Sequence, residues 1–170
     1  CRRIHVMAGK LDQKKDRLEA KTAFIANLKL AAPLAHKRNI VLLIEPINNK
    51  ISIPGYFLNQ VSEAREIIEE VRNDNVRLQF DLYHAQIMHG DLETLIRENI
   101  DITQHFQIAG LSARKEPNLG ELNYPYLLNL IDSLNYKGWI GCEYHPNQST
   151  ISGLGWASEY GIKAWDVSDD

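Results

Sequence analysis

The sequence predicts an α/β protein built on about five parallel strands. Short apolar segments alternate one-for-one with segments of helical periodicity, as in a chain of βαβ units. Right-handed crossovers then place the C-terminal ends of all strands on one face. The pattern fits an open doubly wound sheet or part of an eight-stranded barrel. The segment MAGK at 7–10 has a single glycine and no G-x-G-x-x-G fingerprint, which weakens a nucleotide-binding version of the open sheet.

Five segments have the composition of strands. The run IVLLIEPIN at 40–48 combines β-branched residues and leucine and is stopped by Pro46, which is typical of a buried strand. The other four predicted strands are RIHVMAG at 3–9, VRLQFD at 76–81, TQHFQIAG at 103–110 and GWIGCEY at 138–144.

Four segments between the strands have signals of helices. In 17–38, apolar residues recur at spacings of four, three and four, at Phe24, Leu28, Ala31 and Ala35. In 56–72, one apolar stripe contains Val61, Ala64, Ile67, Ile68 and Val71. The segment 91–99 begins with an acidic residue, as the helix dipole favours. The segment 124–136 follows a plausible N-cap, Asn123, and a short helical tail is expected from Gly155.

Composition narrows the class of protein. The 170 residues are 44% hydrophobic and 24% charged, which is ordinary for one globular domain, and we treat 1–170 as a single domain. The formal net charge is -3 and the basic residues are spread along the chain, which argues against a nucleic-acid partner. The apolar runs are too short to span a membrane. Two distant cysteines and no signal peptide predict a cytoplasmic location.

Four potential metal ligands come at the ends of four successive predicted strands. They are Glu45, Asp81, Gln107 and Glu143, with spacings of 36, 26 and 36 residues. In a barrel these side chains meet at the C-terminal mouth, where barrel enzymes have their active sites. Three carboxylates and one amide suit a hard divalent ion, so Mg²⁺ or Mn²⁺ is the predicted cofactor. Acidic residues near strand ends can also simply face water, but this is a weaker explanation for four in succession.

The strand period of two identifies further inward-facing residues. Counting back from Glu45 gives Leu43 and Val41 as a core layer. Counting back from Gln107 gives His105, and counting back from Asp81 gives Gln79. These two polar residues would lie one layer below the ligands, where they could orient them.

Several motifs resemble the hydroxypyruvate isomerase family, part of the xylose-isomerase-like barrel superfamily. The matching segments, in the right order and spacing from about residue 3 to about residue 160, are IHVMAGK, LLIEPIN, LQFDLYHAQIMHGDL, HFQIAG, GELNYPYLL and YKGWIGCEY. The resemblance departs at 112–114, where Ser-Ala-Arg stands in place of the family's Pro-Gly-Arg, and after Tyr160.

The resemblance implies roles for individual residues. Glu45, Asp81, Gln107 and Glu143 would bind the metal, and Glu45 and Glu143 would also transfer the proton. His84 would bind a substrate oxygen. From its charge, Arg114 is a candidate to hold the carboxylate of a small acid, and Asn48 either binds substrate or finishes a turn.

The implied reaction is the interconversion of hydroxypyruvate and 2-hydroxy-3-oxopropanoate (tartronate semialdehyde) through an enediol, on a small-molecule substrate. The main alternative is a ketose 3-epimerase or another sugar isomerase of the superfamily; epimerases typically have His where Gln107 stands. A third possibility is an inactive, truncated product that acts only as a binding piece.

The resemblance also implies a larger parent protein. Family members have three more βα units before IHVMAG, about a further hundred residues for a barrel of ordinary size. We therefore expect a partial (β/α)8 TIM barrel that contains strands 4–8, with doubtful activity on its own and with possible homo-oligomers.

Overall fold

The computed structural model describes residues 1–11, 16–111 and 113–162. Its five strands form one parallel sheet in which each strand pairs with the next in the chain, in the order β1-β2-β3-β4-β5. The strands are β1 (Arg3–His5), β2 (Val41–Ile44), β3 (Val76–Asp81), β4 (Thr103–Ile108) and β5 (Trp139–Cys142). Because the order never reverses, the sheet has no topological switch point, and the doubly wound alternative is wrong. The predicted partial barrel is confirmed.

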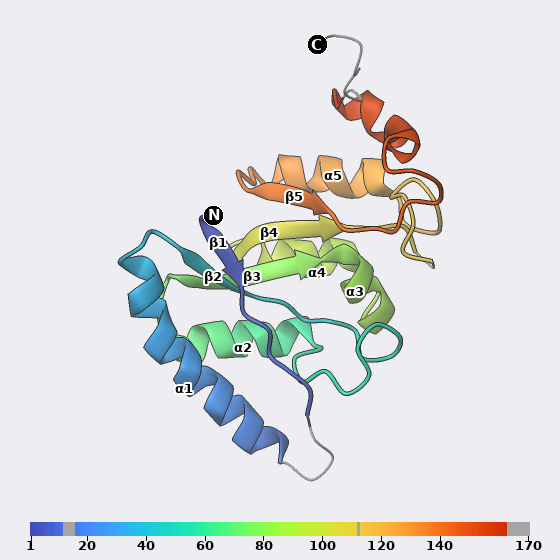
Figure 1. Cartoon of the computed structure of the whole chain (residues 1–170). Coiled ribbons are helices and arrows are strands. Elements are labelled where there is room, and N and C mark those ends of the chain that lie inside the picture. The colour runs from blue at the N-terminus through green and yellow to red at the C-terminus, as the bar shows by residue number, and fades with distance from the viewer. Residues whose placement is uncertain (12–15, 112, 163–170) are drawn as a thin grey trace.

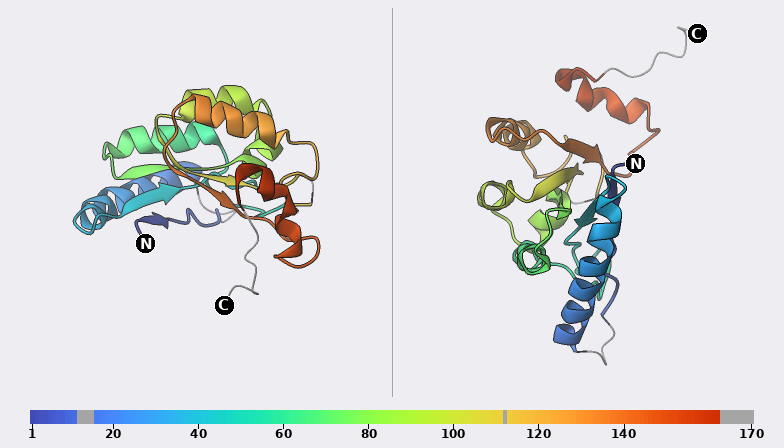
Figure 2. Two further views of the ribbon diagram at one scale, coloured as in Figure 1. Left: turned by 90° about the horizontal axis from the view of Figure 1, so that it is seen from above. Right: turned by 90° about the vertical axis from the view of Figure 1, so that its left-hand side faces the viewer.

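Each strand is followed by a helix along the chain, and β3 is followed by two (Figure 1). They are α1 (Arg17–His36), α2 (Val61–Val71), α3 (Leu82–Met88), α4 (Leu92–Asn99), α5 (Tyr124–Ser133) and the 3₁₀ helix η1 (Ser152–Tyr160). Figure 2 shows α2, α4 and α5 along the outer side of the curved sheet, with its inner side turned away from them. Within the described residues, no helix is long and apolar enough to cross a membrane.

The apolar stripes of the helices form the core against the outer side of the sheet. All five stripe residues predicted for α2 are buried. In α1 the stripe is partly shifted, since the buried residues are Phe24, Ile25, Leu28 and Ala32, whereas Ala31 and Ala35 are only partly buried. The predicted N-cap of α5 is present, because Asn123 Oδ1 accepts a hydrogen bond from the Tyr126 backbone N–H at 3.2 Å.

Helix α3 lies between the predicted strand at 76–81 and the predicted helix at 91–99, where the sequence pattern predicted no helix. The helix follows β3 without a loop, since the Asp81 carboxylate accepts a hydrogen bond from the Tyr83 backbone N–H at 2.8 Å and caps it. His84 therefore lies on a helix and is only 2% exposed.

Two other expectations are corrected at the edges of the sheet. The first strand ends at His5 rather than at residue 9, and Gly9 adopts a positive φ of 78°. The last predicted strand, at 138–144, is shorter too and spans Trp139–Cys142; Trp139 is 70% exposed because β5 has a neighbouring strand on one side only among the described residues.

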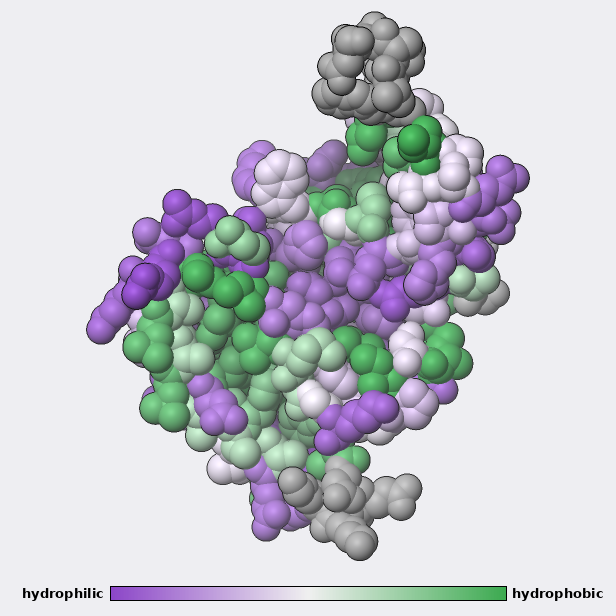
Figure 3. All heavy atoms as spheres, in the orientation of Figure 1, coloured by the Kyte–Doolittle hydropathy of each residue, from purple (hydrophilic) through white to green (hydrophobic). Residues whose placement is uncertain are grey.

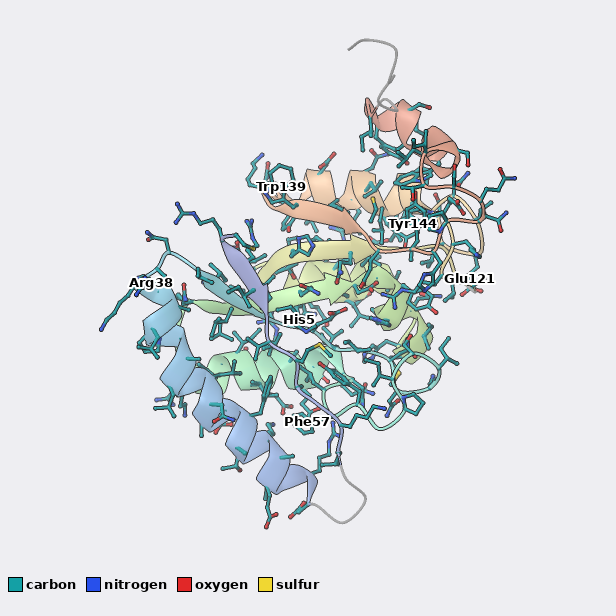
Figure 4. All side chains as sticks on the ribbon, in the orientation of Figure 1. His5, Arg38, Phe57, Glu121, Trp139 and Tyr144 are labelled. Atoms are coloured by element: carbon teal, nitrogen blue, oxygen red, sulfur yellow. The ribbon has the colours of Figure 1, made fainter. Side chains whose placement is uncertain are left out.

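Polar side chains occupy much of the inner face of the sheet. Arg3, His5, Leu43, Gln79, His105 and Trp139 surround a cavity of about 370 Å³. In Figure 3 hydrophilic side chains form a band across the middle of this side of the molecule, and hydrophobic side chains gather below it and to its left. Figure 4 shows His5 near the centre of the same face. This polar layer lies directly beneath the candidate site.

Candidate active site

The structure brings the four predicted ligands to one edge of the sheet. Glu45 directly follows β2, Asp81 ends β3, Gln107 lies near the end of β4, and Glu143 directly follows β5. This edge borders a cleft of about 520 Å³, which Glu45 and Glu143 line together with His84 and Arg114. What the four side chains bind stays a prediction.

A chain of amide hydrogen bonds connects the two glutamates. Gln79 Nε2 donates to Glu45 Oε2 and to Gln107 Oε1, each at 2.7 Å. Gln107 Nε2 then donates to Glu143 Oε2 at 3.0 Å. Gln79 therefore lies where the strand period placed it, one layer below the ligands, and it holds two of them directly.

The two carboxylate oxygens of Glu45 lie in different surroundings. Oε2 accepts the hydrogen bond from Gln79 and lies 3.3 Å from His5 Nδ1. Oε1 is buried and has no hydrogen-bond partner among the described residues. A buried carboxylate oxygen without a partner is costly, so this atom is the one that a cation or a substrate proton would satisfy.

Asp81 is the most enclosed of the four. Its residue is 2% exposed, and Oδ2 lies 3.4 Å from Arg114 Nη2 and 3.5 Å from His84 Nε2. Burial raises the pKa of Asp81 from 3.8 to about 7, although the Arg114 charge and the hydrogen bond from Tyr83 oppose this rise. Burial, followed by the charges of Asp81 and Glu143, also raises the pKa of Glu45 well above its ordinary value.

Arg114 supplies positive charge to the acidic edge. Its Nη2 donates to Glu143 Oε2 at 2.6 Å and to Asp81 Oδ2 at 3.4 Å, while its Nε donates to the Glu143 backbone oxygen at 3.2 Å. The guanidinium also lies over the Tyr83 ring, 5.0 Å from its centroid. Arg114 itself adopts a positive φ of 53°, and Ser112, two residues before it, lies outside the described residues.

His84 and Asn48 are in direct contact beneath the cleft. Asn48 Nδ2 lies 2.7 Å from His84 Nδ1, and Asn48 is fully buried. Burial, and secondarily the charge of Arg114, lowers the pKa of His84 to about 3. Asn48 is not among the residues that line the cleft, so we expect it to act through His84 rather than by touching a substrate.

The donor set fits a divalent metal ion. Glu45, Asp81 and His84 each place one ligand atom within 4.8 Å of the others, and all three are buried. Together with the free Glu45 Oε1, this geometry gives a cation two buried carboxylates at the same point. Gln107 and Glu143 are linked to this group by Gln79 and Arg114.

Sequence reasoning missed His5 and His145 as residues of the site. His5 lies 3.3 Å from Glu45 Oε2, and both histidines line the cleft. His5 has the same strand parity as Arg3 along β1, but this strand contains no predicted ligand from which inward-facing positions could be counted. His145 follows Glu143 by two residues, but it lies beyond the end of β5, where strand parity no longer applies.

Comparisons with known proteins agree with this architecture. A family model described as "Xylose isomerase-like TIM barrel" matches residues 1–160. The chain is 46% identical over 158 residues to a 2-oxo-tetronate isomerase of Cupriavidus necator, and the match covers 93% of this chain and 60% of that protein. It is 38% identical over 159 residues to the hydroxypyruvate isomerase of Escherichia coli, and the match covers 94% of this chain and 61% of that protein.

A solved structure supports the same grouping. The crystal structure of a Brucella melitensis protein described as "AP endonuclease, family 2" has a TM-score of 0.90 and 43% sequence identity, and the match covers 94% of this chain and 61% of that one. The chain spans about 60% of the length of the curated relatives it matches. Since the family model matches nearly the whole chain and the fold is the same, this chain belongs to the xylose isomerase-like TIM barrel family.

Proposed function

We propose that the protein containing this chain is a metal-dependent isomerase of small 2-oxo acids that carry a neighbouring hydroxyl group, such as hydroxypyruvate. The main support for this proposal is that Glu45 and Glu143 line one cleft and are joined by hydrogen bonds through the Gln79 and Gln107 amides. The relatives named hydroxypyruvate isomerase and 2-oxo-tetronate isomerase support this substrate class.

The reaction moves one proton between adjacent carbons. In hydroxypyruvate a proton leaves the carbon that bears the hydroxyl group, and the carbonyl oxygen gains a proton, so that an enediol forms. A proton is then added to the former carbonyl carbon while the oxygen on the neighbouring carbon loses its hydroxyl proton, which gives 2-hydroxy-3-oxopropanoate. Glu45 and Glu143 are the acid–base groups in this proposal, since a carboxylate in the cleft can take the proton and return it to the neighbouring carbon. A Mg²⁺ or Mn²⁺ ion held by Glu45, Asp81, Gln107 and Glu143 would stabilise the negative charge of the enediolate.

Two cationic or polar side chains would orient the substrate. Arg114 already reaches the cleft and would hold the substrate carboxylate through a charge-assisted contact. His84 borders the same cleft and would bind the carbonyl oxygen. Both groups lie on the side of the cleft where Asp81 ends its strand.

A ketose 3-epimerase is the second candidate, and the amide of Gln107 argues against it. Solved epimerases about 20% identical to this chain share the fold, which leaves substrate and reaction open. A DNA-directed activity is not favoured either, because the net charge is -3 without a basic cluster. We also propose a cytoplasmic location, which agrees with the finding that Cys1 and Cys142 are both free. Assembly into homo-oligomers is part of the same proposal.

The test is an isomerisation assay on the natural protein that contains this sequence. Hydroxypyruvate, a four-carbon 2-oxo acid and several uncharged ketoses are compared, with and without Mn²⁺. We expect turnover of the 2-oxo acids that depends on the added metal. Faster turnover of an uncharged ketose with inversion at carbon 3 would establish the epimerase, and no turnover of any substrate would support a binding role.

A further inference from the structure

The amide of Asn48 is held in one orientation by the turn that follows it. Asn48 Oδ1 accepts hydrogen bonds from the backbone N–H groups of Ile51 and Ser52, each at 3.0 Å. Backbone N–H groups can only donate, so this end of the amide must be the oxygen. The other end is therefore the NH₂ group, which can only donate.

Both hydrogens of that NH₂ group have acceptors. One is directed at Ser52 Oγ, 2.8 Å from Asn48 Nδ2, and the other is directed at His84 Nδ1, 2.7 Å away. Asn48 is fully buried and His84 is 2% exposed, so water does not compete for these groups. The four hydrogen-bonding positions of the Asn48 amide are thus all used.

This arrangement determines where the proton of His84 resides. A proton on Nδ1 would set two N–H donors against each other at 2.7 Å in a buried place, which is strongly unfavourable. Nδ1 must therefore be the lone-pair nitrogen, and a neutral imidazole then carries its proton on Nε2. Nε2 lies 3.5 Å from Asp81 Oδ2 and 3.7 Å from Glu45 Oε1, beyond ordinary hydrogen-bond distance from either oxygen.

We propose that Asn48 fixes His84 as the neutral tautomer with its proton on Nε2, so that His84 presents an N–H donor to the site and is not a metal ligand. The metal would then be bound by oxygen atoms alone, although His84 lies close enough to Glu45 and Asp81 to be counted with them. Asn48 is a positioning residue in this proposal, because it acts through His84.

The consequence for substrate recognition rests on the function proposed above. An uncharged N–H at this place can donate a hydrogen bond to a substrate carbonyl oxygen without bringing a second full positive charge next to Arg114. The tautomer itself is a property of the protein without substrate or metal, so it can be tested whether or not the isomerase assignment holds.

The test is nitrogen NMR on the natural protein containing this chain, labelled with ¹⁵N in histidine and free of metal. The His84 signals are assigned by their loss in His84→Gln. We expect a pyridine-like Nδ1 resonance and a pyrrole-like Nε2 resonance at neutral pH. Added Zn²⁺, which suits imidazole ligands, should leave the Nε2 resonance pyrrole-like.

Asn48→Asp tests the cause of the tautomer. The new carboxylate can still accept from Ile51 and Ser52, but its second oxygen needs a donor, so a proton should move onto His84 Nδ1. The matched control is Asn123→Asp, which adds the same charge at an exposed N-cap and should leave the His84 signals unchanged. A proton on Nδ1 in the parent protein, loss of the Nε2 proton on Zn²⁺ addition, or unchanged His84 signals in Asn48→Asp would each overturn the proposal.

Discussion

At the residue scale, the two oxygen atoms of a glutamate in the site can have different hydrogen-bond partners. Glu45 Oε2 is held by Gln79, whereas Oε1 is buried without a partner among the described residues. Glu143 is held by both Gln107 and Arg114 on Oε2. Each side chain is thus fixed through its Oε2 atom, and the Oε1 atom of Glu45 is left to bind a cation or a substrate proton.

Replacing either glutamate by glutamine tests the proposed proton transfer. Glu45→Gln and Glu143→Gln keep the shape of the side chain but remove the base, so turnover of hydroxypyruvate should fall by roughly 10² or more. Affinity for Mn²⁺ should fall too, because one negative charge is lost. Steady-state kinetics and calorimetric Mn²⁺ titration of the purified natural protein measure both effects. Near-normal turnover in both variants would remove the glutamates from the mechanism.

Arg114 is expected to discriminate between charged and uncharged substrates. Arg114→Ala should raise the apparent KM for hydroxypyruvate far more than that for an uncharged ketose, because a charge-assisted contact worth on the order of 1.5–3 kcal/mol is lost. Parallel kinetics on the two substrates make the comparison. Equal effects would mean that Arg114 acts mainly by pairing with Asp81 and Glu143.

The raised pKa of Asp81 predicts a pH-dependent stability difference. Without metal, the unfolded chain ionises Asp81 near its ordinary pKa of 3.8, whereas the folded protein retains the proton up to about pH 7. The folded state therefore loses stability as pH rises through this window. Asp81→Asn lacks the titrating carboxylate and therefore this loss. The free energy of unfolding of the variant minus that of the parent should therefore grow as the pH rises from about 4 to 7.

Comparing variant with parent is necessary because His84 acts in the opposite direction. Its pKa is lowered to about 3, so its contribution to stability is lost as pH falls below the ordinary value of 6.5. Urea denaturation at several pH values gives the difference, and Asp132→Asn on α5 controls for the loss of a carboxylate. Saturating Mn²⁺ should reverse the ranking. A difference that does not change with pH would contradict the assignment for Asp81.

At the scale of the secondary-structure elements, helix α1 contains a proline in its interior, where the helical backbone disfavours it. Pro33 lies within α1 and is exposed, so its ring removes one helical hydrogen bond without adding buried surface. Pro33→Ala should raise the free energy of unfolding by about 1–2 kcal/mol, since the gain in the helix exceeds the added freedom of the unfolded chain. Chemical denaturation measures the change. Destabilisation by this substitution would show that the ring makes contacts that the protein needs.

At the scale of the whole molecule, the described sheet has two open edges. Strand β1 pairs only with β2, and strand β5 pairs only with β4. Ile4 on β1 is 45% exposed and Trp139 on β5 is 70% exposed. Unpaired backbone groups next to exposed apolar side chains form a template for association.

A polypeptide of residues 1–170 alone should therefore self-associate and show little or no isomerase activity. Light scattering coupled to gel filtration would detect the association. Ile4→Lys combined with Trp139→Lys should reduce it, because charges on edge strands disfavour strand addition. An exposed substitution of the same kind away from the edges, Leu119→Lys, is the control. A monomeric polypeptide with substantial turnover would mean that the open edges do not matter.

The sequence by itself determined the order of strands and helices and the candidate ligands. Strand parity and helical periodicity are local properties, so Glu45, Asp81, Gln107 and Glu143 could be placed at strand ends, and Gln79 beneath them, without knowing their neighbours. The same local patterns failed for 82–88, because α3 depends on capping by Asp81, whose side chain sequence reasoning had assigned only to a metal.

Only the tertiary structure decided which atoms face one another. The contact between Asn48 and His84 joins residues 36 positions apart, and the contact between Arg114 and Asp81 joins residues 33 positions apart. Neither follows from a repeat or a period, since each depends on how a loop or a helix leaves the sheet. Burial, which sets the pKa values of Glu45, Asp81 and His84, is likewise a property of the packed molecule, because it counts surrounding atoms from every strand and helix near the cleft.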